Sequence, residues 1–173
     1  MEKKILIGII VAVAVVVIVV AALDNHDGKT VDAPASSFMP DISAFPSGEN
    51  WTNNGTSSDG ATYTEGVVSY SQGTYVKNIS GFTYTTTVKI YVFDTTENAK
   101  NAYSTTKASF IGTTTTNYGP FDQGFRHGDA LGYGYVFQEM NVYMEIKFGS
   151  IQLDSDTKEI LSSIEDKIHK AAK

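Results

Sequence analysis

The sequence predicts an α+β domain: an antiparallel sheet with two helices packed on one face, preceded by one N-terminal transmembrane helix. Apolar and polar residues alternate over residues 82–93 and again over 142–148, as they do in strands with one buried face. Two other stretches, 94–110 and 154–170, repeat apolar residues at steps of three and four, as amphipathic helices do. The order of strands, helix, hairpin and helix is typical of an α+β fold, whereas a closed barrel or a pure β-sandwich would leave the helices no place.

The apolar run Ile5–Leu23 predicts a membrane anchor. Its nineteen residues carry no charged side chain, and as a helix they would span roughly 28 Å, close to the thickness of a hydrocarbon core. Lys3 and Lys4 precede the run and acidic residues follow it, so the positive-inside rule places the N-terminus in the cytoplasm and the remainder outside. We therefore expect a single-pass protein of the cell membrane, anchored by residues 1–23.

Three other kinds of segment could carry such an apolar run: a signal peptide, a lipoprotein anchor and a type IV pilin start. A cleaved signal peptide stays open, because Val20-Ala21-Ala22 is an acceptable cleavage pattern, although the run exceeds the usual apolar region of a signal peptide. A lipoprotein anchor is excluded because the chain has no cysteine to acylate. Type IV pilins place a glutamate five residues after the processed glycine, and Val13 stands at that distance from Gly8. This departure disfavours a pilin.

Residues 24–48 are expected to form an extracytoplasmic tether, and residues 49–173 a globular α+β domain. The tether stretch carries prolines among small polar residues and has no sustained apolar period. Three apolar side chains in its second half could pack on the edge of the domain: Met39, Ile42 and Phe45.

Five strands are expected, over 67–71, 74–79, 82–93, 133–137 and 142–148. A turn at Gln72-Gly73 joins the first two strands, and a turn at Glu139–Asn141 joins the last two.

Both helices begin with the spacing of a capping box, Asp94 with Glu97 and Asp156 with Glu159. The second helix turns four apolar side chains to one side, and their full burial would contribute roughly 6–12 kcal/mol as an upper limit. These side chains are Ile160, Leu161, Ile164 and Ile168.

The chain is acidic and lacks cysteine. It carries 19 acidic and 13 basic residues, for a formal net charge of −6, without a basic cluster. This balance argues against nucleic acid as a partner. The lack of cysteine excludes disulfides, thiol catalysis, iron–sulfur clusters and cysteine-bound zinc, and no motif predicts another cofactor or metal.

One group of residues could support chemistry. Asp122, Arg126, His127 and Asp129 lie close together in the irregular stretch 112–132, and loops on a rigid scaffold often carry function. A carboxylate beside an imidazole could support acid–base catalysis or weak metal binding. The stronger interpretation is structural: Arg126 pairs with a neighbouring aspartate and holds a glycine-rich loop. We assign no catalytic residue.

Two further features concern the surface. Glycosylation sequons begin at Asn50, Asn54 and Asn78, and their use depends on a host that glycosylates its surface proteins. Threonines and tyrosines on the strands could form a polar–aromatic binding face, with an ordinary solvated sheet as the alternative: Tyr84, Thr85, Thr87, Tyr91 and Tyr143.

The chain resembles small membrane-anchored surface proteins of unknown function from methanogenic archaea. The resemblance rests on MEKKILIGII with its Val/Ala-rich continuation, on KIYVFDTTENAKNAY, on YGYVFQEMNVYMEIKF and on the terminal amphipathic helix. The order of elements over residues 65–170 is also similar to the sheet-plus-helices architecture of PsbP-like domains. This resemblance implies an extracytoplasmic α+β domain and transfers no functional residue.

We expect a non-catalytic binding or interaction domain at the cell surface, with a protein or a cell-wall glycan as its partner. The alternative is an extracytoplasmic enzyme or metal-binding module that uses the 122–129 loop. A third class, an accessory subunit of a membrane complex, would depend on the first helix.

Overall fold

The computed structural model describes residues 29–45, 50–57, 65–110, 114–116, 119–129, 132–149 and 154–173. The expected transmembrane helix Ile5–Leu23 lies outside these residues. Among the residues that are described, no helix is long and apolar enough to cross a membrane.

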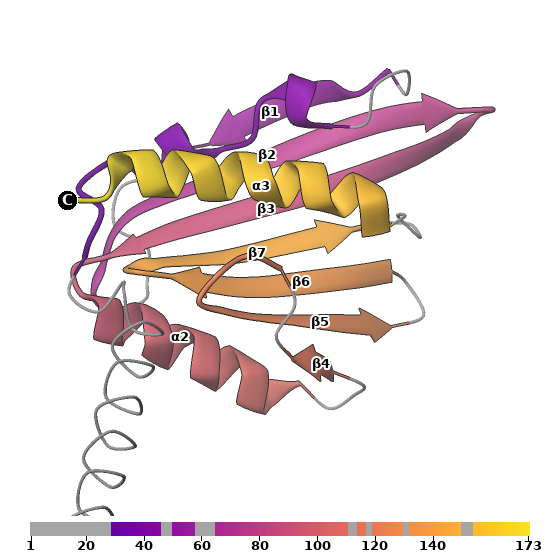
Figure 1. Cartoon of the computed structure of the whole chain (residues 1–173). Coiled ribbons are helices and arrows are strands. Elements are labelled where there is room, and N and C mark those ends of the chain that lie inside the picture. Colours follow the sequence, from indigo (N-terminus) through magenta and orange to yellow (C-terminus); the bar gives the residue numbers. More distant parts are fainter. Residues whose placement is uncertain are drawn as a thin grey trace, which may run out of the picture.

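The described chain forms one antiparallel sheet with helices on it (Figure 1). The sheet has seven strands in the order β1-β2-β3-β7-β6-β5-β4. The strands are β1 Thr52–Ser57, β2 Val67–Ile79, β3 Phe82–Phe93, β4 Thr114–Thr116, β5 Gln123–Asp129, β6 Gly132–Glu139 and β7 Val142–Phe148. The helices are the 3-10 turns η1 Ala35–Phe38 and η2 Ile42–Ala44, and the α-helices α2 Thr96–Ser109 and α3 Asp154–Ala171. The α+β class is confirmed.

The two helices lie on opposite faces of the sheet, so the expectation of both on one face was wrong. Apolar side chains of α3 pack with one set of strand residues, which includes Val88, Ile90 and Met144. Residues of α2 pack with the alternate set, which includes Phe93 and Tyr143. The reason is that β3 and β7 carry large side chains on both sides of their pleat, so each face needs a cover.

The alternation expected for β3 and β7 is confirmed. Their even-numbered residues from Val88 and Val142 onward face α3 and are almost fully buried, while Tyr91, Tyr143 and Glu145 face α2. The apolar stripe of α3 is also confirmed, because Ile160, Leu161, Ile164 and Ile168 are at most 1% exposed.

Several expected boundaries differ. The two short strands expected over 67–71 and 74–79 are one strand of 13 residues, and Gly73 lies inside it. A Cβ at Gly73 would collide with Met39, which packs over the strand, so the glycine serves close packing and not a turn. The turn lies instead at Ser80-Gly81, where both residues have left-handed φ angles of 51° and 83°.

The start of α2 also differs by one residue. Its N-cap is Thr95, whose hydroxyl accepts from the backbone N–H of Asn98 at 3.2 Å. Asp94 accepts instead from the side-chain amide of Asn98 at 2.7 Å. In the other expected capping box, Asp156 lies inside the first turn of α3, since the helix already begins at Asp154.

Residues 29–45, here called the N-terminal strap, pack on the face that carries α3. Val31, Ala35, Phe38, Met39 and Phe45 are buried in the same core as α3. The described part of the expected tether is therefore folded onto the domain, because its apolar side chains complete the core. Of the three side chains expected at the domain edge, Met39 and Phe45 are buried, whereas Ile42 is 41% exposed.

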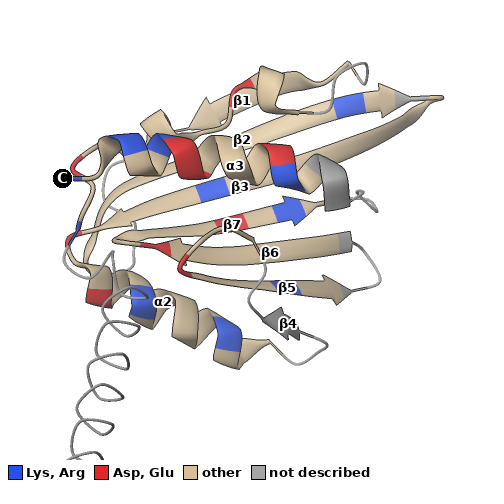
Figure 2. Ribbon diagram, viewed as in Figure 1, with Lys and Arg blue, Asp and Glu red and all other residues tan. Residues whose placement is uncertain are grey.

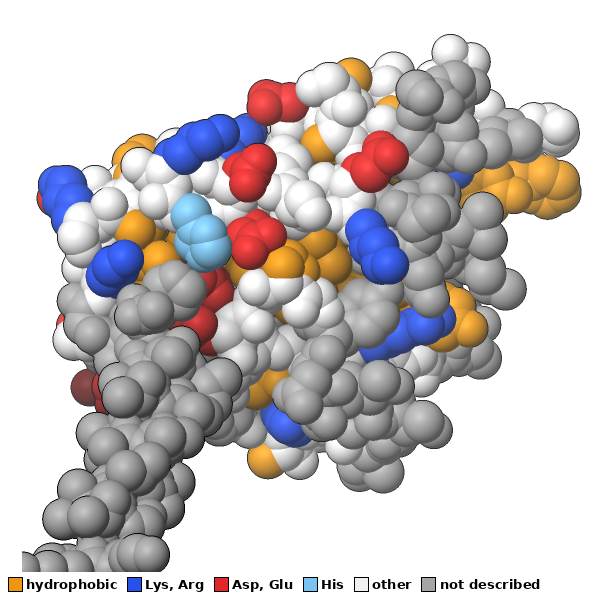
Figure 3. Space-filling view, viewed as in Figure 1, with side chains coloured by type: hydrophobic (Ala, Val, Ile, Leu, Met, Phe, Trp, Pro, Cys, Tyr) orange, Lys and Arg blue, Asp and Glu red, His pale blue; other side chains and the backbone are white. Residues whose placement is uncertain are grey.

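Polar contacts hold the strap to α3 and to the residue that follows it. Lys167 of α3 donates to the carbonyl oxygen of Met39 at 2.6 Å and to Asp41 at 2.8 Å. Val31 forms an antiparallel bridge with Ala172. Charges of both signs alternate over α3 (Figure 2), so the outer face of this layer is mixed and not basic. The hairpin of β2 and β3 extends past the other strands and exposes apolar side chains at its tip (Figure 3), where Phe82 is 68% exposed.

Asn141 connects the strap to the sheet. The side chain of this buried residue accepts from the backbone N–H of Val31 at 2.7 Å and donates to the carbonyl oxygens of Val31 and Phe93 at 3.1 and 2.7 Å. These bonds satisfy three backbone groups where three segments meet.

We predict that Asn141→Ala lowers the free energy of unfolding by roughly 3 kcal/mol, because it leaves buried backbone groups without partners. Urea denaturation of the purified chain in detergent measures this loss. Asn101→Ala, at an exposed position of α2, is the control and should cost much less. Equal costs for the two variants would contradict the structural role of Asn141.

Candidate functional site

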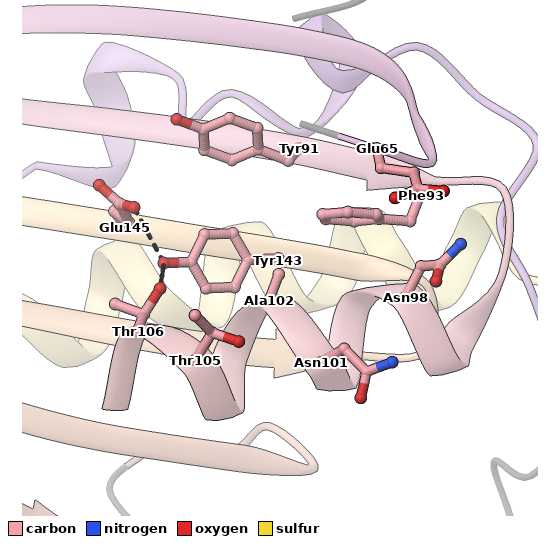
Figure 4. Close-up of a pocket in the computed structure, with 10 residues that line it drawn as sticks. All are labelled: Glu65, Tyr91, Phe93, Asn98, Asn101, Ala102, Thr105, Thr106, Tyr143 and Glu145. Atoms are coloured by element: carbon pink, nitrogen blue, oxygen red, sulfur yellow. Dashed lines mark hydrogen bonds between the residues drawn. The ribbon is translucent and has the colours of Figure 1, made fainter. Parts of the chain in front are cut away.

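A groove lies between α2 and the strands β3 and β7, with a volume of about 420 Å³. We call it the α2 groove (Figure 4). It is lined by Glu65, Tyr91, Phe93, Asn98, Asn101, Ala102, Thr105, Thr106, Tyr143 and Glu145. Two apolar side chains of α2, Ala99 and Tyr103, seat the helix on the sheet. Asn98, Asn101, Ala102 and Thr105 follow at steps of three and four, so they form one flank of the helix beside the groove.

Tyrosine rings from three neighbouring strands form a row at the sheet side of the groove. The ring centroids of Tyr70 and Tyr91 are 4.8 Å apart, and those of Tyr91 and Tyr143 are 5.5 Å apart. Both pairs are tilted, a geometry that favours contact between the edge of one ring and the face of the next. Tyr91 is half-buried, so part of its ring remains accessible from the groove.

A hydrogen-bonded bridge joins α2 to the sheet at the bottom of the groove. The hydroxyl of Tyr143 donates to Glu145 Oε1 at 2.9 Å, and it shares a hydrogen bond of 2.9 Å with the hydroxyl of Thr106 (Figure 4). We call these three residues the Tyr143 bridge. Burial, followed by the charge of Glu145, raises the pKa of Tyr143 well above its ordinary value. Tyr143 therefore stays protonated and donates to the carboxylate.

Two carboxylates line the groove, Glu65 and Glu145, and the second pairs with a lysine. Lys89 Nζ lies 3.6 Å from Glu145 Oε2, and both side chains are more than a third exposed. This ion pair therefore contributes little to stability, but it orients the carboxylate. Burial is the largest cause that raises the pKa of Tyr91 above its ordinary range, followed by the charge of Glu145 and the neighbouring hydroxyl of Tyr70. Neither tyrosine can then serve as a base near neutral pH.

The α2 groove thus combines an aromatic surface with amide, hydroxyl and carboxylate groups. Such a set can hold a ligand that has both a flat apolar face and several polar groups. Among the described residues, no group of three His, Cys, Asp or Glu side chains could hold a metal ion.

Three of the four residues expected to form a site in a loop lie on an ordinary strand. Asp122 precedes β5, and Arg126, His127 and Asp129 are part of it. The expectation of an irregular loop over 112–132 was therefore wrong for the described residues. Gln123–Asp129 pairs with β6 over its whole length. This segment mixes polar residues with glycines and has no alternating apolar positions, so its sequence does not indicate a strand.

The strand separates these side chains. Arg126 faces one side, where its guanidinium stacks 4.2 Å from the ring centroid of Tyr133. His127 faces the other side, where its imidazole lies 3.8 Å from the ring centroid of Phe110. Asp122 is five residues from His127, which along a strand is roughly 16 Å. The structure therefore does not bring Asp122, Arg126 and His127 together.

Asp122 belongs to a different group of polar contacts. Its backbone N–H donates to Glu139 at 2.7 Å, and its carboxylate accepts from the backbone N–H of Met140 at 3.1 Å. Glu139 is 1% exposed and lies 2.8 Å from Nε2 of His169 on α3. Asp122 thus ties the turn before β5 to the β6–β7 hairpin, which is a structural role.

The three sequon asparagines are exposed. Asn50 precedes β1, Asn54 lies in β1, and Asn78 lies near the end of β2, where its side chain accepts from the hydroxyl of Thr83 at 2.8 Å. Their glycosylation stays a prediction.

Two residues of the α2 groove, Tyr91 and Tyr143, are among those expected in a polar–aromatic face. Tyr84, from the same expectation, lies on the opposite face beside Lys77. The helix side of the groove was missed, since its Asn and Thr residues have no distinctive spacing. The feature of the sequence that could have indicated this side of the groove was the row of small and polar residues along one flank of the helix that follows β3.

Comparisons with known proteins show only the fold. No family model and no curated protein matches the chain. Among solved structures, the chain is similar to the extracellular domain of PknH from Mycobacterium tuberculosis, with a TM-score of 0.53 and 13% sequence identity. The match covers 79% of this chain and 95% of that domain. The resemblance to surface proteins of methanogenic archaea stays a prediction.

A tight contact between Gly134 and His127 allows a test of the β5–β6 packing. A Cβ at Gly134 would overlap the imidazole of His127. We predict that Gly134→Ala lowers the free energy of unfolding by about 2 kcal/mol. In the double variant with His127→Ala, this cost should largely disappear, because the overlapping ring is gone. Denaturation of the four proteins of the cycle measures the coupling, and additive costs would contradict the contact.

Glu165 of α3 predicts a dependence of stability on pH. Burial is the largest cause that raises the pKa of Glu165; Glu139 and Asp166 raise it further, and His169 opposes them. Its charged form is therefore less stable in the folded than in the unfolded chain. The contribution of protonated Glu165 to the stability of the folded chain is fully present below the ordinary glutamate range. It is lost as the pH rises through the pKa that Glu165 has in the folded chain.

We accordingly predict that Glu165→Gln raises the melting temperature near neutral pH, and that this gain shrinks as the pH falls through the ordinary glutamate range. Thermal denaturation over a pH series provides the measurement. Glu159→Gln, at an exposed position of the same helix, controls for the change in net charge. A gain that is independent of pH, or a loss near neutral pH, would contradict the raised pKa of Glu165.

Proposed function

We propose that this chain is a membrane-anchored binding domain of the cell surface that recognises an extracytoplasmic partner in the α2 groove and catalyses no reaction. The observation that carries the proposal is the groove itself. It places the accessible ring of Tyr91 opposite the amides and hydroxyls of α2, with Asn101 and Thr105 exposed along its rim. The polar groups can fix the orientation of a ligand that stacks on the ring.

The location at the cell surface has two supports. Ile5–Leu23 has the length and composition of a membrane anchor, with lysines on its N-terminal side. The PknH domain, which shares the fold, is an extracellular domain by its description. A cell-wall glycan or a protein of the same compartment would meet the groove there.

The side-chain chemistry supports binding in preference to catalysis. Tyr143 is held protonated, and Glu145 already accepts its hydrogen bond and lies beside Lys89. A general base needs a carboxylate or imidazole that can take a proton from the ligand. The alternative enzyme or metal-binding module loses its geometric support, because Asp122 precedes β5 whereas His127 lies near the other end of that strand.

A tryptophan on the helix rim tests the proposal. Thr105→Trp would fill the groove from α2, whereas Ser104→Trp places the same side chain on an exposed part of the helix that does not line it. We predict that the full chain in detergent micelles sediments with isolated cell-envelope material of its host. Thr105→Trp should reduce this retention roughly tenfold, and Ser104→Trp should leave it unchanged.

Two results would contradict the proposal. In the first, the amount of wild-type chain that sediments with the envelope material is no greater than the amount that sediments in detergent without that material. In the second, the Thr105→Trp and Ser104→Trp variants are retained as well as the wild type. Circular dichroism of both variants establishes that each one is folded before the comparison.

A further inference from the structure

A second hollow continues the α2 groove toward the C-terminal end of the helix. It has a volume of about 320 Å³, and its lining includes Phe110, His127, Val136 and Lys147. The two hollows share two lining residues, Thr106 and Glu145, which both belong to the Tyr143 bridge. They are therefore neighbouring parts of one channel between α2 and the sheet.

The Tyr143 bridge lies low enough for a ligand to pass over it. Tyr143 is 4% exposed, so the bridge closes the bottom of the channel. Thr106 and Glu145 are half-buried, and each presents part of its polar side chain to a ligand above. From Asn98 to Ser109 the channel follows twelve residues of α2, which is roughly 18 Å of helix, and Phe110 comes directly after them.

An accessible aromatic surface stands in each of the two hollows. In the α2 groove, Tyr91 is supported by Tyr70. In the second hollow, Phe110 is 36% exposed and lies against His127 with a centroid distance of 3.8 Å. The polar groups of Thr106 and Glu145, which line both hollows, lie between the two rings. Aromatic, polar and aromatic surfaces thus follow one another along the length of the channel.

We infer that the channel takes a neutral, unbranched glycan chain, which stacks one sugar ring on Tyr91 and another on Phe110. This inference rests on the proposed function and names its ligand class. Sugar rings present apolar C–H faces to aromatic rings and hydroxyl groups to amides, hydroxyls and carboxylates, which are the groups that line the channel. Over the whole channel the carboxylates of Glu65 and Glu145 are matched by Lys89 and Lys147, and this balance favours a neutral chain over an ionic one.

The sheet itself disfavours an extended peptide. A bound peptide strand would pair with an exposed strand edge. The strands beside the channel have no such edge, because β3 is paired with β2 and β7, and β7 is paired with β3 and β6. Nucleic acid is disfavoured by the acidic net charge of −6. A glycan needs neither a strand edge nor a basic surface.

Chain length is the decisive variable in the test. The full chain in detergent micelles is applied to an array of neutral glycans of graded length, from single sugars to hexasaccharides, together with a peptide library. Calorimetry with the best glycan series then gives the dissociation constants. We expect the affinity to rise with glycan length until both aromatic surfaces are occupied.

Variants in the two hollows test the two aromatic surfaces separately. Tyr91→Ala should weaken short and long glycans alike, by roughly tenfold. Phe110→Ala should weaken the long glycans roughly tenfold and leave disaccharides unchanged. Lys147→Trp, which fills the second hollow from an exposed strand position, should reproduce this selective loss if Phe110→Ala disturbs folding. Phe82→Ala removes an exposed aromatic side chain at the distant hairpin tip and is the matched control.

The outcomes distinguish this inference from the proposed function. Affinity that is independent of length, or long-glycan binding that survives both Phe110→Ala and Lys147→Trp, overturns the extended channel. Binding of peptides without any glycan overturns the ligand class. In these cases, loss of envelope retention in Thr105→Trp would still support the proposed function. If that retention is also unaffected, both fail.

Discussion

The central constraint in this structure is that strands β3 and β7 must bury both of their faces. One face carries Val88, Ile90 and Met144, each of which has no solvent exposure. The other carries Tyr143, which is 4% exposed, and Tyr91, whose large ring is half-buried beside it. A strand pair of this kind cannot sit in a sheet with one solvated side, so the fold needs a cover on each face.

The two covers differ in extent, and the difference creates the α2 groove. One face is covered by α3 together with the N-terminal strap, which Asn141 and Lys167 hold in place. On the other face α2 spans only part of the sheet, and its flank consists of alanine, asparagine and threonine. Small side chains cannot fill the space beside the tyrosine rings, so a channel remains there.

The sequence predicted the elements better than their arrangement. The alternation in β3 and β7 and the stripe of Ile160, Leu161, Ile164 and Ile168 were sufficient, because strong periodicity directly reports which side of an element is buried. Strand β5 was missed, because QGFRHGD has no such period. The candidate site built on it failed for the same reason: residues adjacent in a supposed loop point to opposite faces once the segment is a strand.

The sequence by itself determined the class of the domain, its main strands and helices, and the apolar run that predicts a membrane anchor, since these depend on local composition and period. Only the tertiary structure decided which face each helix covers, that the strap belongs to the core, and that Tyr91 and Tyr143 meet Thr106 and Asn101 across a groove. These are contacts between segments far apart in the chain. Their geometry follows from strand order and from the fit of large against small side chains, neither of which has a local signature.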